Sequence, residues 1–263
     1  MKKILAALLL CMTFTFAHAA NYYDDIDDGY YQRLTDPYYM QGLGVIVLDT
    51  TGWIEQSIHG PKDKVYAANE TMTIGFTPWL VMGAGISYVK YDATDEKDFL
   101  NPYAVARIRF LDRLFKIDVI GKVTFDAFDT VAEGGIESGT QKYDGTLIVG
   151  PRFSWISFGA KGFYQYWRKG TEIINPDREY MSNIGGAGFV SIRPLSFFDF
   201  GGEAGYIVYD AIKTKDEKLF YFDLNANFQV YKDNIALGAF YYYNNYSESE
   251  DRHALGARLK LAF

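Results

Sequence analysis

The chain has 263 residues, of which 49% are hydrophobic, 17% are aromatic and 22% are charged, and its formal net charge is −7. The high aromatic content excludes a disordered chain, and the negative charge argues against a nucleic-acid-binding protein. After the first 20 residues there is no run of about 20 apolar residues, so a bundle of membrane-spanning helices is excluded. The length suits one large domain or two small ones.

Residues 1–19 have the pattern of a secretory signal peptide. Lys2 and Lys3 form a charged start, residues 4–16 are apolar, and residues 17–19 (Ala-His-Ala) place small side chains at the positions that determine cleavage. We therefore expect an exported protein that is cleaved after residue 19, with cleavage after residue 20 as the alternative.

Cys11 is the only cysteine of the chain, and it lies within this predicted signal peptide. The exported protein is therefore expected to have no disulfide bond and no thiolate chemistry. A lipid attached at Cys11 is a less favoured alternative, because Leu10 stands where a small residue is needed. Residues 20–40 follow as an acidic, tyrosine-rich leader, which we expect to be solvated.

From about residue 41 onward, apolar and polar residues alternate with a period of two, which is typical of β-strands with one apolar face. The clearest example is 253–263, where Leu255, Leu259 and Phe263 share one face while Arg258 and Lys260 lie on the other. In chain order, the pattern predicts about twelve strands: 41–50, 64–77, 80–91, 99–110, 115–127, 141–155, 158–169, 180–193, 197–210, 218–230, 235–246 and 252–263.

The predicted strands and their connections favour a membrane wall. Most strands have 10–14 residues, whereas a tilted strand needs about 9–11 to cross a bilayer. Short connections alternate with long polar ones, which we place near 51–63, 92–98, 128–140, 170–179, 211–217 and 247–251. Short turns at one end and long loops at the other are typical of outer-membrane barrels.

Aromatic residues mark both ends of the predicted strands. One set lies at the short turns, and a second set lies near the long loops. Rings at both levels are expected where hydrocarbon meets water, as two aromatic belts. The first set is Trp79, Phe110, Phe115, Trp155, Phe158, Phe197, Phe198 and Tyr231; the second is Tyr66, Tyr88, Phe125, Tyr143, Tyr166, Tyr209, Phe220 and Tyr243.

No linker divides the chain, so residues 41–263 are predicted to form one all-β domain, a single transmembrane antiparallel β-barrel with short periplasmic turns and long extracellular loops. With its signal peptide, its alternating hairpins and a last strand that ends in Phe263, the chain resembles the bacterial outer-membrane β-barrel (porin-like) superfamily. The resemblance implies a location in the outer membrane among lipid and lipopolysaccharide. It also implies that Phe263 serves as a signal for the barrel assembly machinery.

The polar face of the predicted strands carries many charges, which we place on the inside of the barrel. Charged groups that line a lumen bias it toward ions of opposite sign. The residues predicted to line the pore are Arg107, Arg109, Lys122, Arg152, Lys161, Arg193, Arg258, Lys260, Asp118, Glu203 and Asp223.

The sequence thus predicts a channel for passive diffusion of small hydrophilic solutes, with a weak bias toward anions. No enzyme activity, cofactor, metal or nucleic acid is implied. Two alternatives stay open. One is a surface enzyme that acts on lipid or peptide, for which His59 and His253 are the histidines after the signal peptide. The other is a non-conducting structural or adhesive barrel.

Overall fold

The computed structural model describes residues 34–58, 64–95, 97–125, 141–168, 181–208, 218–231, 234–247 and 250–263. Throughout these segments the regular elements are β-strands. None of the described residues belongs to a helix long and apolar enough to cross a membrane.

The strands follow one another along the chain as an antiparallel sheet. Alternating apolar and polar positions favour this structure, because each strand then has one face for hydrocarbon and one for the interior. Their bounds are β1 (Ile46–Ser57), β2 (Lys64–Thr77), β3 (Leu80–Tyr91), β4 (Lys97–Phe99), β5 (Tyr103–Asp112), β6 (Phe115–Thr124), β7 (Lys142–Pro151), β8 (Ile156–Trp167), β9 (Met181–Leu195), β10 (Phe198–Val208), β11 (Lys218–Tyr231), β12 (Ile235–Ser247) and β13 (Glu250–Ala262).

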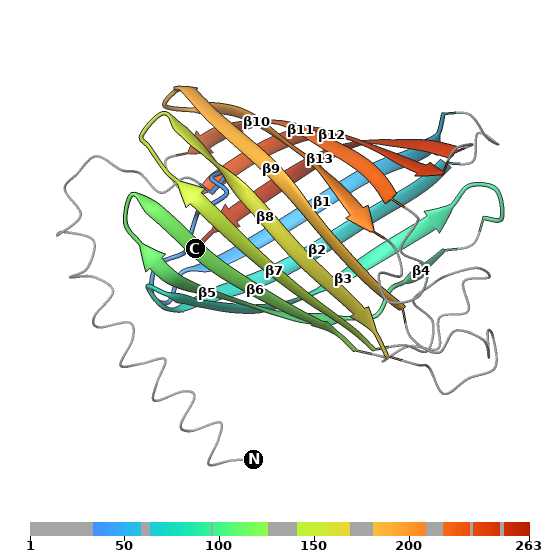
Figure 1. Cartoon of the computed structure of the whole chain (residues 1–263), viewed down its shortest axis with the longest axis horizontal. Coiled ribbons are helices and arrows are strands. Elements are labelled where there is room, and N and C mark those ends of the chain that lie inside the picture. Colours follow the sequence, from blue (N-terminus) through green and yellow to red (C-terminus); the bar gives the residue numbers. More distant parts are fainter. Residues whose placement is uncertain are drawn as a thin grey trace, which may run out of the picture.

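The sheet closes on itself into a twelve-stranded barrel (Figure 1). The first and last strands pair antiparallel from Val47 opposite Ala262 to Ser57 opposite Arg252. β4 is an extra three-residue strand that pairs with the end of β3, beyond the part of β3 that pairs with β5. Each of the other twelve described strands thereby has a hydrogen-bonded neighbour on both sides, as a structure surrounded by hydrocarbon requires.

Most predicted strand positions are confirmed, and β2 and β3 have the predicted bounds. The first strand was predicted at 41–50 but runs from Ile46 to Ser57. Its outward positions include Thr50 and Gly52, which hide the apolar alternation in the sequence. The strand predicted at 99–110 corresponds to β5, which begins later, at Tyr103, and ends at Asp112, whereas Phe99 ends the short strand β4.

Short turns lie at one end of the barrel and longer connections at the other (Figure 1). The carboxyl terminus lies at the short-turn end, where the main chains of Ile46 and Phe263 bond to each other at 2.9 and 3.1 Å. One predicted long loop, 247–251, is wrong, because β12 continues to Ser247 and β13 begins at Glu250. The alternation of turn lengths nevertheless gives the barrel two distinct ends.

The outer face of the wall is apolar and exposed. Leu147, Leu224 and Leu255 are 45%, 55% and 62% exposed, as expected for side chains that meet lipid. Trp79 and Trp155 at the short turns are also exposed, in agreement with the predicted belt at that end. The polar side chains of the alternation therefore point inward.

Candidate functional site in the barrel interior

Residues 34–41 lie inside the barrel near its short-turn end and cross it. Leu34, Tyr38 and Met40 are almost fully buried, at 0%, 0% and 3% exposure. The prediction that the leader is solvated is therefore wrong for residues 34–40. The acidic part of the leader, 20–33, lies outside the described residues, and the division of the chain at residues 19 and 40 stays a prediction.

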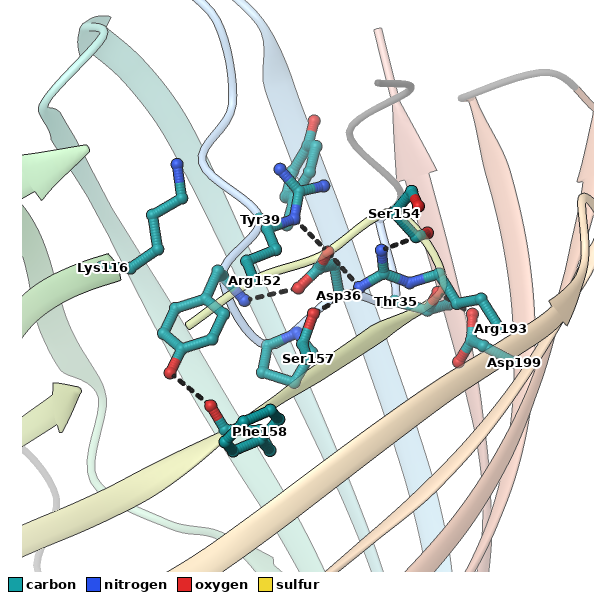
Figure 2. Close-up of polar contacts among 12 residues, drawn as sticks. Thr35, Asp36, Tyr39, Lys116, Arg152, Ser154, Ser157, Phe158, Arg193 and Asp199 are labelled. Carbon is teal, nitrogen blue, oxygen red and sulfur yellow. Dashed lines mark hydrogen bonds and ion pairs between the residues drawn. The ribbon is translucent and has the colours of Figure 1, made fainter. Parts of the chain in front are cut away.

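Asp36 is the main anchor of this inner segment (Figure 2). Its Oδ2 accepts a hydrogen bond from Arg152 Nε at 2.6 Å and another from the guanidinium of Arg193. The same nitrogen of Arg193 donates to Ser157 Oγ at 2.7 Å. All four residues are buried, so one carboxylate is held between two arginines away from bulk water.

A second pair of arginines binds the main chain of the inner segment. Arg107 donates to the carbonyl oxygens of Pro37 and Tyr39 at 2.8 and 3.1 Å, and Arg109 donates to that of Tyr38. Both arginines also contact the fully buried carboxylate of Asp118, with Arg109 Nε 2.8 Å from Oδ1. Asp118 thus orients two cations whose remaining donors hold the segment in place.

Tyr38 fills the space between the segment and the wall. Its hydroxyl donates to the carbonyl of Phe158 at 3.1 Å, and its ring packs against Phe189 with 5.6 Å between centroids. Burial, reinforced by nearby Asp118 and Asp36, raises the pKa of Tyr38, so the hydroxyl keeps its proton. Glycines at 150 and 159 make room, because a Cβ on either would come within 2.5 Å of the Tyr38 oxygen.

The two ends of the inner segment are attached to different strands. At one end, Lys260 of β13 donates to the carbonyl of Leu34 at 2.7 Å, and Leu34 packs in an apolar cluster with Val47, Ala236 and Ala262. At the other end, the side chain of Gln41 donates to Thr73 Oγ1 of β2 at 2.9 Å. Gly44, at φ +74°, then turns the chain into β1.

Beyond the inner segment, the lumen contains a cavity of about 550 Å³. Thr35, Asp36 and Pro37 form part of its wall on one side, and Tyr221 and Tyr242 lie among the other lining residues. Four basic side chains and three acidic ones line it: Arg107, Lys161, Arg258, Lys260, Asp36, Glu203 and Asp223. Asparagines 225 and 227 add amide groups, so the polar parts of the lining can bind water or polar solute.

The cavity charges are arranged in pairs along its walls. Lys161 contacts the carboxylate of Glu203, which also accepts a hydrogen bond from the Tyr221 hydroxyl at 2.8 Å. Arg258 Nε is 2.7 Å from Asp49 Oδ1, and Lys260 Nζ is 3.8 Å from the other oxygen of that carboxylate. Whereas the arginines Arg109, Arg152 and Arg193, which hold the inner segment, are buried, the Arg258 side chain is 45% exposed.

The structure divides the predicted pore-lining residues into two groups. One group borders the cavity: Arg107, Lys161, Arg258, Lys260, Glu203 and Asp223. The other is buried at the short-turn end: Arg109, Arg152, Arg193 and Asp118. Lys122 belongs to neither group, since its ammonium lies 3.9 Å from the centre of the Tyr103 ring.

Sequence reasoning missed Asp36 and Asp49. Asp36 was assigned to the leader, and Asp49 lies in the part of β1 whose alternation is weak. The sequence of residues 34–41 is too short to show a repeated alternation, so no local pattern marks Asp36 as a buried, inward-facing residue. Of the enzyme candidates, His59 lies outside the described residues. His253 packs against the ring of Tyr241, and within the described segments no hydrogen bond or ion pair joins its side chain to a serine or a carboxylate.

No protein-family model matches the chain, and neither does any curated protein sequence. Several solved structures share its fold. An outer membrane channel from Pseudomonas putida F1 superposes with a TM-score of 0.66 and 11% identity, over 91% of this chain and 100% of that one. The NanC porin gives 0.55 and 13% identity, over 80% and 98% of the two chains.

The KdgM porin is also similar, with a TM-score of 0.50 and 11% identity, over 80% of this chain and 97% of that one. A further structure of that porin is in complex with disordered oligogalacturonate. The chain therefore has the porin-like fold of an outer-membrane β-barrel channel, as the sequence predicted. The predicted location in the bacterial outer membrane agrees with this fold and with the apolar outer wall.

Proposed function

We propose that the protein is an outer-membrane channel through which small hydrophilic solutes diffuse passively, with a weak preference for anions. The observation that carries the proposal is the cavity of about 550 Å³ inside the barrel, lined by charged and amide side chains from several strands. Such a lining can replace part of the hydration shell of a polar solute. The apolar outer wall indicates that the cavity lies within a barrel that crosses a membrane.

The anion preference rests on the exposed cations of the cavity. Arg258 and Lys161 have side chains that are 45% and 29% exposed, so they can meet a solute without first leaving a buried site. The KdgM porin, which shares the fold, is known in complex with oligogalacturonate. Acidic sugars of small size are therefore the first anionic solutes to test on this chain.

A recording in a planar lipid bilayer tests the proposal. The purified, detergent-folded barrel is expected to give steady steps of conductance and to let small sugars and sugar acids enter liposomes. A correctly folded barrel that gives no conductance and no solute entry would contradict a channel and favour the structural or adhesive alternative. The enzyme alternative predicts hydrolysis that is lost in His253→Ala, measured with lipid and peptide substrates.

Arg258 and Lys161 are the suitable positions for testing selectivity. Arg107 and Arg152, though also predicted to line the pore, hold the inner segment, so their substitution would change the shape of the lumen together with its charge. Replacing Arg258 by alanine is expected to reduce the preference for chloride over potassium. An unchanged reversal potential in a salt gradient would contradict the assigned role.

A further inference from the structure

Away from the inner segment, the charged side chains of the cavity and their ion-pair partners form two groups of opposite net charge. The group on β8, β10 and β11 consists of Lys161, Glu203 and Asp223. Two carboxylates face one ammonium there, so this group is negative. The group on β13 and β1 consists of Arg258, Lys260 and Asp49. Two cations share one carboxylate there, so this group is positive.

Asp223 is the charge of the negative group that has no ionic partner. Glu203 contacts Lys161 and accepts a hydrogen bond from the Tyr221 hydroxyl at 2.8 Å. Asp223 stands directly opposite Glu203, accepts a hydrogen bond from Asn225 Nδ2 at 3.1 Å, and meets no ion pair within the described segments. Like charges directly opposite each other on neighbouring strands repel. A positive group brought to Asp223 by a solute would therefore be stabilised.

Two tyrosine rings make this position suitable for an organic ammonium group. Tyr221 and Tyr242 both line the cavity, with 6.0 Å between their ring centroids, and Tyr242 stands opposite Asp223 in the register of β11 and β12. The face of an aromatic ring attracts an ammonium group. In the part of the chain that the structure describes, no group of three or more His, Cys, Asp or Glu side chains could hold a metal ion.

The positive group lies nearer the short-turn end than Asp223 does. Tyr242, opposite Asp223, pairs with Ala254 of β13, and Arg258 is four residues further along that strand, roughly 13 Å. Asp49 contacts the Arg258 guanidinium at Nε and one terminal nitrogen, which leaves donors on the other terminal nitrogen. The cavity can therefore bind a positive group and a negative group that are separated along the strands.

We propose that the solutes this channel favours are short peptides of two or three residues, which carry an ammonium group at one end and a carboxylate at the other. The ammonium group binds at Asp223, and the carboxylate binds at Arg258 and Lys260. An extended tripeptide spans about 10 Å, and a cavity of about 550 Å³ is within the size range of small-molecule sites. The inference rests on the proposed channel function, because it assigns a solute to the same cavity.

Three forms of one tripeptide test the inference on the unaltered chain. Trialanine has both charges, N-acetyl-trialanine lacks the ammonium group, and trialanine amide lacks the carboxylate. Entry of each into liposomes that contain the folded barrel is divided by the entry of a neutral sugar. Trialanine is expected to enter about threefold faster than either modified form, which is the effect of one partly exposed ion pair.

Two variants then assign each end of the peptide to its side chain, after circular dichroism has shown that each is folded. In Asp223→Asn, the ratio of trialanine to N-acetyl-trialanine entry should fall toward one, because the ammonium group has lost its partner. In Arg258→Gln, the ratio of trialanine to trialanine amide entry should fall toward one. Asp95→Asn is the control, because its carboxylate is exposed near the long loops, and it should keep both ratios.

The outcomes separate this inference from the channel function on which it rests. If neither the sugar nor any peptide enters, the channel function itself is wrong. If the sugar enters but the three peptide forms enter equally fast, or N-acetyl-trialanine enters fastest, the inference alone is overturned. Ratios that stay unchanged in Asp223→Asn and Arg258→Gln would also overturn it, because the peptide ends would then bind elsewhere.

Discussion

The two halves of the lumen use the same kinds of side chain in opposite ways. At the short-turn end, Arg109 and Asp118 are 5% and 0% exposed and bind the inner segment or each other. In the cavity beyond, the Arg258 side chain is 45% exposed and its partner Asp49 is on the adjacent strand. The first arrangement fixes a piece of chain across the barrel, and the second leaves charges available to water and solute.

The comparison shows that an inward-facing charge is not by itself a pore-lining charge. The alternation of a strand determines the face on which a side chain lies. Whether that side chain anchors the protein or meets a solute depends on what else occupies the lumen. Residues 34–41 make this difference, because they bring main-chain carbonyls and one carboxylate to the arginines at the short-turn end.

Deleting residues 34–41 should remove the difference between the two halves, and it is the largest change we expect. The segment crosses the lumen from Lys260 of β13 to Arg109 of β5, so its loss opens the part of the lumen that it occupies. We expect conductance to rise several-fold in planar bilayers, with a larger size limit for sugars entering liposomes. Unchanged conductance in a folded barrel would show that the segment does not limit passage.

Asp36→Asn should weaken the anchor while leaving the segment in the chain. The substitution keeps the shape of the side chain but leaves Arg152 and Arg193 without their shared carboxylate. Breaking a buried ion pair by removing one partner costs about 3–5 kcal/mol. We expect protease to reach the segment faster and the current to fluctuate between two levels.

Asp95→Asn is the matched control for Asp36→Asn. Its carboxylate contacts Lys90 at 2.8 Å near the long loops, and Lys90 holds the pKa of Asp95 below its usual range. The pair is exposed to solvent, so its loss should leave both the segment and the current unchanged. An equal effect of the two variants would mean that the anchor at Asp36 has no special role.

Charge changes in the cavity should alter selectivity but not the segment. Arg258→Ala should move the reversal potential toward cation preference, and Asp223→Asn should move it toward anions, by roughly a few millivolts to tens of millivolts in a tenfold salt gradient. Protease resistance of residues 34–41 should be unaffected in both variants. Shifts of the same sign would contradict the assignment of both residues to the conducting path.

The outer wall could be predicted from the sequence, whereas the contents of the lumen could not. Hydrocarbon imposes a strict period of two, which located β2 and β3 to the residue. The period failed in β1, where Thr50 and Gly52 replace large apolar residues on the outer face. The carboxylate of Asp36 binds Arg152 and Arg193, which lie 116 and 157 positions further along the chain. No local sequence pattern encodes contacts over such separations.

Tyr38→Phe is the mildest test of how the inner segment is held, because it removes one hydroxyl and keeps the ring. The ring contact with Phe189 remains, while the hydrogen bond to the carbonyl of Phe158 is lost. The lost hydrogen bond is expected to weaken the binding of the segment to the wall by about 1 kcal/mol. Protease should then cut the segment a few-fold faster, and the reversal potential should not change. If Tyr38→Phe opened the lumen as fully as the deletion, the segment would depend on this one contact rather than on the arginines.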